Sequence, residues 1–156
     1  MTNTQFYYII NHMKNRTVKA GDNWKTPQDL YDKLDKEFHF DFDPCPYVEG
    51  PIPEDKDGLK ITWGNCNFVN PPYSRTLKEQ FVKRGVQMKL QGKTSVFLLP
   101  VSTSTALFHD TIKPNADEIR FLRGRVKFSR YNTRGIWVTN NVGMHDSMIV
   151  VFKGIK

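Results

Sequence analysis

Apolar positions along the chain follow a helical period in some stretches and a strand period in others. Helical spacing occurs in residues 27–38, 77–90 and 102–112. Strand-like runs occupy residues 38–43, 67–69, 94–100, 118–122, 126–128 and 147–152. Because strands alternate with helices, the pattern predicts an α/β fold with a mostly parallel sheet and helices on both faces.

Local signals mark the ends of the predicted helices. Thr26 is expected to be the N-cap of the first helix, with Pro27 at its first position. Leu90 is the last residue on the apolar face of the second helix, and Gly92 suits its C-terminal stop. The third helix is expected to begin at Ser102 or Thr103 and to end before a proline at position 114.

The length and the cysteines limit the class of protein. A chain of 156 residues is long enough for one sheet-based domain, which we place at residues 22–156, after an N-terminal arm of residues 1–21. No apolar stretch is long enough to cross a membrane. Cys45 and Cys66 form no Cys-x-x-Cys pair and the histidines show no ligand spacing, which predicts a reduced, cytoplasmic protein without a metal site.

Positive charge is concentrated in the second half of the chain. The net charge is +7, and residues 71–156 hold 15 basic and 5 acidic side chains. The stretch from Arg120 to Arg134 has six basic residues and no acidic one. Such a distribution is typical of nucleic-acid binding, although a soluble surface that happens to be basic would look the same.

The polar segment between Ser129 and Asp146 is long for a plain connection. Its aromatic side chains could stack on bases or wedge between them while arginines meet phosphates. A solvated loop or a dimer contact is the alternative. The candidate nucleic-acid-binding residues are Arg123, Arg125, Lys127, Arg130, Tyr131, Arg134 and Trp137.

The most distinctive stretch is Asn70-Pro71-Pro72-Tyr73, directly after a strand-like run. Two prolines exclude a continued helix or a central strand, so a stiff loop at the carboxyl end of a strand is expected. An amide, carbonyls without a neighbouring N–H and a flat ring suit an exocyclic amino group on a planar base. The alternative is a turn whose Tyr73 fills the core.

This loop resembles the catalytic loop of amino-methyltransferases that use S-adenosylmethionine. Together with Trp24-Lys25-Thr26-Pro27, the Phe40–Cys45 stretch and Asp57-Gly58-Leu59, it resembles the small phage and prophage DNA adenine-N6 methyltransferases of Dam type. The resemblance runs from about Asp22 to Phe152. It implies a compact class I, Rossmann-like methyltransferase fold and activity in the cytoplasm of a bacterial host.

The resemblance also implies roles for individual residues. Tyr73 would stack on an adenine flipped out of double-stranded DNA, and the Asn70 side-chain oxygen and the Pro71 carbonyl would accept from its N6 amino group. The implied catalytic set is Asn70, Pro71, Pro72 and Tyr73, and the implied cofactor-binding set is Trp24, Thr26, Pro27, Asp43, Pro44, Cys45, Asp57 and Asn70. The loop at positions 44–46 departs from the glycine-rich form usual in methyltransferases.

Within that set, the Thr26–Pro27 edge would face the methionine end of the cofactor. Asp43 would hold its positively charged or amino part, and Asp57 or a neighbour would accept from its adenine amino group. No metal is implied. Dimerisation would let a chain this small cover its target.

Other readings stay open on the sequence alone. The acceptor could be RNA or a protein glutamine, or the chain could be a non-catalytic DNA-binding relative. Methylation would serve either protection from restriction or regulation.

Overall fold

The structure is a computed structural model and describes residues 15–156. Residues 1–14, most of the predicted arm, lie outside the described part. The main helices are α2 (Gln28–Phe38) and α3 (Arg75–Leu90), followed by a π-helical turn η3 (Leu107–Ile112) and α4 (Lys113–Asn115). Two short 3₁₀ turns are η1 (Ala20–Asp22) and η2 (Glu54–Lys56). The strands are β1 (Cys66–Val69), β2 (Thr94–Pro100), β3 (Glu118–Phe121), β4 (Lys127–Tyr131), β5 (Trp137–Val142) and β6 (Ser147–Phe152).

The main sheet is mixed and has the strand order β1-β2-β6-β3. β1 pairs with β2 in parallel, whereas β6 runs antiparallel to both of its neighbours, β2 and β3. Three of the four strands therefore share one direction, as expected, but only one of the three pairings is parallel. The apolar pattern of residues 147–152 identifies a buried strand and carries no information about its direction.

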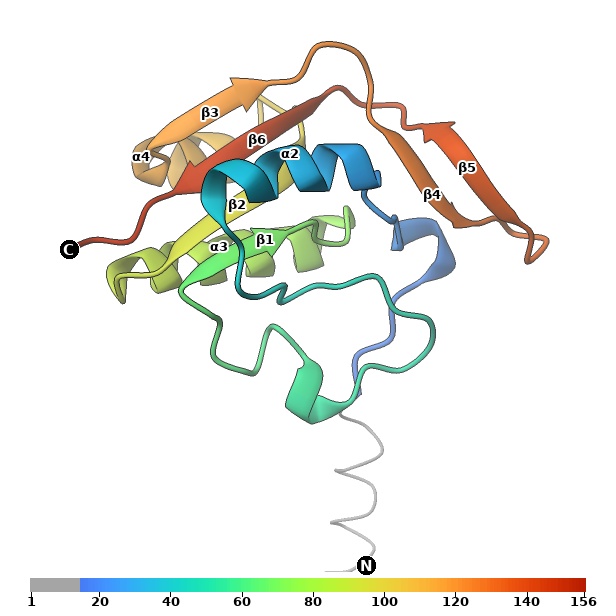
Figure 1. Ribbon diagram of the computed structural model, residues 1–156, viewed down its shortest axis with the longest axis horizontal. Coiled ribbons are helices and arrows are strands. Elements are labelled where there is room, and N and C mark those ends of the chain that lie inside the picture. Colours follow the sequence, from blue (N-terminus) through green and yellow to red (C-terminus); the bar gives the residue numbers. More distant parts are fainter. Residues whose placement is uncertain (1–14) are drawn as a thin grey trace, which may run out of the picture.

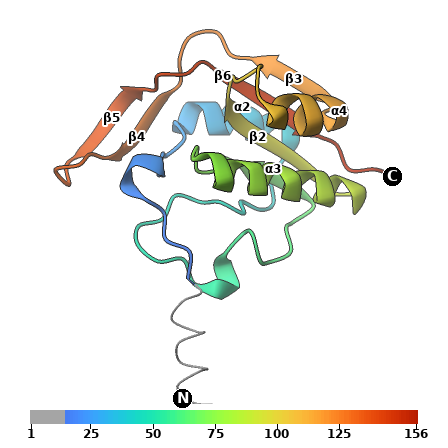
Figure 2. The same ribbon diagram turned by 180° about the vertical axis from the view of Figure 1, so that it is seen from behind.

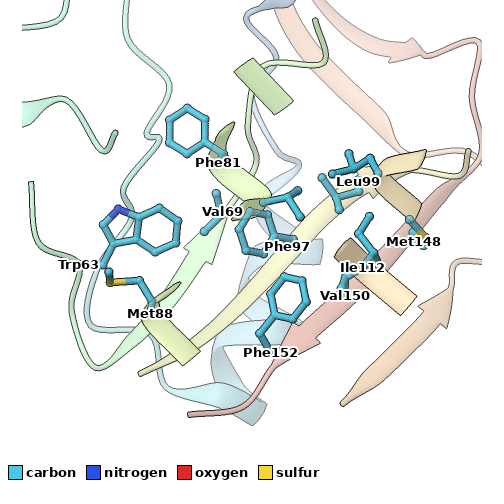
Figure 3. Packing of buried hydrophobic residues seen from close by; sticks show 12 residues of the cluster. Trp63, Val69, Phe81, Met88, Phe97, Leu99, Ile112, Met148, Val150 and Phe152 are labelled. Atoms are coloured by element: carbon cyan, nitrogen blue, oxygen red, sulfur yellow. The ribbon is translucent and has the colours of Figure 1, made fainter. Parts of the chain in front are cut away.

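Helices cover both faces of this sheet, which confirms the expected layering (Figures 1 and 2). Side chains alternate along each strand, so one set packs against α2 and the other against α3 and η3. On the α3 side, Phe97 and Phe152 lie at the centre of a fully buried cluster with Trp63 and Phe81 (Figure 3). On the α2 side, Leu34 joins a second cluster of buried strand residues. No helix in the described part of the chain is both long and apolar enough for a membrane span.

Most of the polar segment between Ser129 and Asp146 lies in a β-hairpin. β4 and β5 pair with each other in a separate two-stranded sheet, which projects to one side of the main sheet (Figure 1). The strand-like run at residues 126–128 contains the start of β4. The turn at Asn132–Gly135 is closed by a bond from the Gly135 amide to the Asn132 carbonyl, with Gly135 at φ 72°. Because β5 is largely exposed, it lacks the apolar alternation by which strands are recognised.

Helix ends differ from the expectation in two places. Pro27 stands at the N-cap of α2 without a side-chain hydrogen bond, so Thr26 is not the cap. The helical stretch after β2 begins only at Leu107, because the Thr105 hydroxyl accepts from the Phe108 amide and starts the turn there. It also continues through Pro114 and does not end before it.

Two further expectations are corrected by burial and pairing. Leu90 is 68% exposed, since the buried face of α3 is formed by Phe81, Val82, Gly85 and Met88. Residues 38–43 form no full strand, and only Phe42 makes an isolated parallel bridge, to Asn67 of β1. That bridge still places the Asp-Pro-Cys-Pro loop beside the loop that follows β1. As predicted, Gly92 lies just after the C-terminal end of α3, with φ 80°.

Candidate active site

The side-chain amide of Asn70 has a fixed orientation at the carboxyl end of β1. Its Nδ2 donates to the Trp24 carbonyl at 2.9 Å and to the Thr26 hydroxyl oxygen at 3.1 Å. Because a carbonyl can only accept, the amino side of the amide must face Trp24. The opposite atom, Oδ1, is buried and has no hydrogen-bond partner within residues 15–156. A buried acceptor left without a donor is costly in a fold, and because two cavities adjoin Asn70, this oxygen is a candidate ligand-binding atom.

Two cavities adjoin Asn70. The larger, of about 260 Å³, lies between the 16–24 segment and the 44–53 loop, and the smaller, of about 180 Å³, lies between the Trp24–Gln28 stretch and Asp43. Asn70, Trp24, Cys45 and Tyr47 line both. The two cavities therefore form one composite site on both sides of these residues. It contains most of the predicted cofactor-binding residues: Trp24, Thr26, Asp43, Pro44, Cys45 and Asn70.

Asp43 lies in the smaller cavity and closes the turn that replaces a glycine-rich loop. Its Oδ1 accepts from the Cys45 amide at 2.8 Å, which shapes the Asp-Pro-Cys-Pro loop. Burial raises the pKa of the Asp43 carboxyl to about 7, and the Cys45 hydrogen bond offsets part of that rise. Burial, reinforced by the negative charge of Asp43, raises the pKa of the Cys45 thiol to about 12, so this sulfur stays protonated. A cationic ligand group would complement an ionised Asp43.

The raised pKa of Asp43 predicts a pH-dependent cost to stability. Between pH 4 and pH 7 the native carboxyl holds a proton that the unfolded one releases, so this group's contribution to stability falls as the pH rises. Asp43→Asn keeps the oxygen acceptor and cannot ionise. We expect its advantage in unfolding free energy over the parent to grow by about 2 kcal/mol between pH 5 and pH 8, measured by urea unfolding. A constant difference across that range would contradict the prediction.

Asp57 is engaged by a residue of the predicted arm. Its carboxylate forms an ion pair with Arg16, with Nη2–Oδ1 at 3.1 Å and both oxygens within 3.3 Å of Nε. The same carboxylate accepts from the Leu59 amide at 3.0 Å. Asp57 is 2% exposed and lines neither cavity, whereas Arg16 lines the larger one. The structure therefore places Arg16, and not Asp57, at the wall of the composite site.

The remaining loop residues lie on two sides of Asn70. Pro72 lines the larger cavity, and Pro71 is buried. The Tyr73 ring packs in the α2-side cluster, edge-on to Phe128 at 6.1 Å, and its hydroxyl lies 3.5 Å from the Leu98 carbonyl. Burial raises the pKa of the Tyr73 phenol. The Tyr73 ring thus lies outside both cavity walls and against the hairpin.

The hairpin is joined to the site by backbone hydrogen bonds. Lys25 and Ser129 exchange both bonds, at 2.8 and 3.2 Å, so the Trp24–Thr26 stretch lies beside β4. The Arg130 guanidinium stacks on the Trp24 ring at 4.4 Å. Arg130, predicted to contact DNA, therefore also supports the residue whose carbonyl orients the Asn70 amide.

The other predicted nucleic-acid-binding residues divide into two surfaces. At the hairpin, the Trp137 ring lies edge-on to Tyr131 at 5.0 Å and to Tyr47 at 5.6 Å, while Arg134 is exposed at the turn. A second surface, which we call the basic groove, has a volume of about 520 Å³ and lies between the start of α2 and the 122–127 segment. It is lined by Pro27, Asp29, Leu30, Lys33, Leu122, Arg123, Gly124, Arg125, Val126, Lys127 and Asn140.

Several residues at the site were not predicted from the sequence. Arg16 comes from the arm, to which the pattern assigns no chemistry, and Asp22 is the first residue after it. The Asp22 carboxylate accepts from the Ser74 amide at 2.7 Å and so fixes the end of the Asn-Pro-Pro-Tyr loop. Tyr47 lines both cavities from a loop that shows only turn signals. Within the described residues, no group of three or more His, Cys, Asp or Glu side chains is placed to hold a metal ion.

Comparison with known proteins adds three similarities. A family model described as DNA N-6-adenine-methyltransferase (Dam) matches residues 13–156. A curated relative, the DNA N-6-adenine-methyltransferase of Escherichia phage T1, is 32% identical over 106 residues, which cover 63% of this chain and 43% of the relative. The chain thus spans less than half the length of that relative. Among solved structures, the tRNA (m1A58) methyltransferase TrmI from Aquifex aeolicus matches with a TM-score of 0.32 and 13% identity, over 67% of this chain and 38% of that one.

Proposed function

Because the chain belongs to the DNA N-6-adenine-methyltransferase (Dam) family, we propose that it transfers a methyl group from S-adenosylmethionine to the N6 amino group of adenine in double-stranded DNA. The observation that carries this proposal is the unpartnered, buried Oδ1 of Asn70 beside two cavities. An oriented oxygen acceptor is what an exocyclic amino group needs in order to be held and positioned.

The residues of the composite site fit the proposed cofactor. When bound, S-adenosylmethionine supplies a methyl group on a positively charged sulfur. Asp43 would hold the charged or amino part of its methionine end, with Thr26 nearby on the same cavity wall. The apolar and aromatic wall of the larger cavity, which includes Tyr47 and Ile52, suits a planar base.

Asn70 would act on the acceptor base. Its Oδ1 and the Pro71 carbonyl would accept hydrogen bonds from the two N6 hydrogens, which draws the amino nitrogen toward tetrahedral geometry and frees its lone pair to attack the sulfonium methyl. The sulfur–methyl bond breaks, its electron pair stays on the sulfur of the departing S-adenosylhomocysteine, and the methylated nitrogen then loses one proton to water. Holding both reactants in line removes most of the entropic cost of their meeting. Since Oδ1 is already aimed by two hydrogen bonds, the acceptor needs no reorganisation during the reaction.

The acceptor adenine would leave the duplex and stack on Tyr73, which requires the Tyr73 ring to turn away from the α2-side cluster in which it packs. Stacking is worth about 1–3 kcal/mol per base and offsets the cost of flipping. Phe128 of β4 contacts the Tyr73 ring, so the hairpin would support the base from the DNA side. Arg134, Tyr131 and Trp137 on the same hairpin would contact the flanking duplex.

For the fold, we propose the compact class I, Rossmann-like arrangement. Its support is the strand order, with the Asp43 loop and the Asn70 loop side by side at the carboxyl ends of neighbouring strand segments. Ligands of open α/β sheets bind at such edges.

The test is transfer of labelled methyl from S-adenosylmethionine to unmethylated duplex DNA, followed by nucleoside analysis. We expect the label in N6-methyladenine. Label in RNA or in a protein substrate and not in DNA would replace the proposed acceptor. No transfer by folded protein to any of the three would contradict the proposed activity.

The basic groove predicts a defined salt response. Removing two of its charges, in Arg123→Ala/Lys127→Ala, should weaken duplex binding for all sequences and lower the slope of log K against log salt by about 2, because two phosphate contacts are lost. The matched control, Lys83→Ala/Lys113→Ala, removes two exposed lysines from α3 and α4, on the other face of the sheet. Equal effects of both variants on the slope would show that only net charge matters.

A further inference from the structure

We propose that Arg16 binds the carboxylate of the cofactor's methionine end, while Asp43 takes its ammonium group. The proposal rests on the proposed use of S-adenosylmethionine and names the groups that recognise its amino-acid part. It assigns a binding role to the segment before the Trp-x-Thr-Pro stretch.

Two nitrogens of the Arg16 guanidinium donate hydrogen bonds to Asp57, and the third has no hydrogen-bond partner among the described residues. Nε and Nη2 face the Asp57 carboxylate at 3.1–3.3 Å. Nη1 is buried and meets no acceptor among the described residues. Arg16 lines the larger cavity. A guanidinium carries donors on more than one side of a rigid plane, so one Arg can bind two carboxylates.

The position of this donor is held from three directions. Asp57 fixes the charged edge, and the guanidinium carbon lies 5.2 Å from the centroid of the buried Phe81 ring. The backbone is fixed by a bond from the Ile52 amide to the Arg16 carbonyl at 2.9 Å, next to a bridge between Thr17 and Pro51. The Arg16 side chain is therefore already ordered before a ligand binds, so binding does not incur the entropy cost of immobilising it.

Arg16 and Asp43 both lie near Cys45. Cys45 lines both cavities, with Arg16 in the wall of the larger and Asp43 in the wall of the smaller. Both charges act on its thiol: Asp43 raises the Cys45 pKa and Arg16 lowers it. An amino-acid group carries an ammonium and a carboxylate on one carbon atom, so a zwitterion is the ligand class that satisfies a cation and an anion placed around one residue.

The charge of the site also suits a cation. With Asp43 ionised, Arg16, Asp57 and Asp43 together carry one negative charge, and Asp22, Glu49 and Lys56 in the wall of the larger cavity add one more. S-adenosylmethionine carries one net positive charge from its sulfonium, ammonium and carboxylate. A phosphate on Nη1 would instead add negative charge next to two carboxylates. The balance favours a zwitterionic cation over a phosphorylated nucleotide.

The experiment compares two ligands by calorimetry. S-adenosylhomocysteine has the amino-acid end, and 5′-methylthioadenosine lacks it. We expect Arg16→Lys, which keeps a charge beside Asp57 but loses the fork, to weaken S-adenosylhomocysteine binding by about 10- to 100-fold and 5′-methylthioadenosine binding by less than about 3-fold. Lys19→Ala, an exposed lysine in the same segment, is the control and should change neither affinity.

Each outcome decides a separate point. Equal losses for both ligands, or no loss for S-adenosylhomocysteine, would overturn the proposed carboxylate contact. Failure of the wild-type protein to bind either ligand would contradict the proposed cofactor itself. If Arg16→Lys does not fold, as judged by thermal melting, the double variant Arg16→Gln/Asp57→Asn replaces the ion pair by a neutral one, and the same selective loss is expected from it.

Discussion

Asn70→Ala is expected to lower the rate of methyl transfer by about 10²–10³-fold while the protein stays folded. The substitution removes the single acceptor that Trp24 and Thr26 hold in place toward the cavities. The loss should appear in the single-turnover rate with labelled S-adenosylmethionine, more than in the affinity for duplex DNA. The reason is that Oδ1 acts on the amino group during reaction and contributes little to contacts with the DNA backbone.

Asn67 offers a matched control on the same strand. It is buried, its Nδ2 donates to the Gly64 and Thr94 carbonyls, and its Oδ1 also has no partner in residues 15–156. It lines neither of the two cavities. Asn67→Ala should therefore lower stability and leave the single-turnover rate of the folded fraction unchanged. Full activity in Asn70→Ala, or equal rate losses in both variants, would remove Asn70 from the catalytic role.

Gly58→Ala is expected to destabilise the protein by on the order of 3 kcal/mol and to weaken cofactor binding. A Cβ at this position would overlap the Pro44 carbonyl oxygen and lie 2.7 Å from its carbon. Both are backbone atoms, so neither can rotate away. On its other side the turn is fixed by Trp63, whose Nε1 donates to the Gly58 carbonyl at 2.7 Å. The added methyl must push the Pro44 loop toward the cavity.

The unfolding free energy is measured by urea unfolding, and the affinity for S-adenosylhomocysteine is measured without urea. Gly143→Ala is the control, because a Cβ there would meet nothing within 4 Å. It should change the unfolding free energy by less than about 0.5 kcal/mol. A Gly58→Ala variant as stable as this control would show that the close approach to Pro44 is not required in solution.

The parts of the fold that follow from the sequence are those with continuous apolar runs. Residues 96–100 and 148–152 are apolar throughout, and both are buried stretches of strands as predicted. The hairpin could not be recognised because β5 exposes side chains on both faces, so its residues carry no alternating signal. The position of the Asn-Pro-Pro-Tyr loop at the carboxyl end of a strand could be predicted because prolines restrict the backbone independently of tertiary contacts. Arg16 was missed because its role depends on Asp57, 41 positions away.

The role predicted for Thr26 shows how a local rule can be overridden. A threonine before a proline satisfies the helix-start rule, yet its hydroxyl accepts from Asn70 and not from the helix backbone. The long-range hydrogen bond from Asn70 thus determines the role of the Thr26 hydroxyl, and the local preference for a helix cap does not. The division between an arm of residues 1–21 and a domain from residue 22 stays a prediction, although residues 16 and 17 already bond to the 51–57 stretch.

The central position of β6 has a consequence for synthesis on the ribosome. β6 follows every other strand in chain order, yet it lies between β2 and β3, and β3 pairs with no other strand of the sheet. Until residue 152 has left the exit tunnel, one edge of β2 and all of β3 lack partners, and the apolar residues of β2 lack half of their cover. The nascent chain therefore stays open to aggregation and to chaperones until the last strand emerges, and both halves of the sheet then close in one late step.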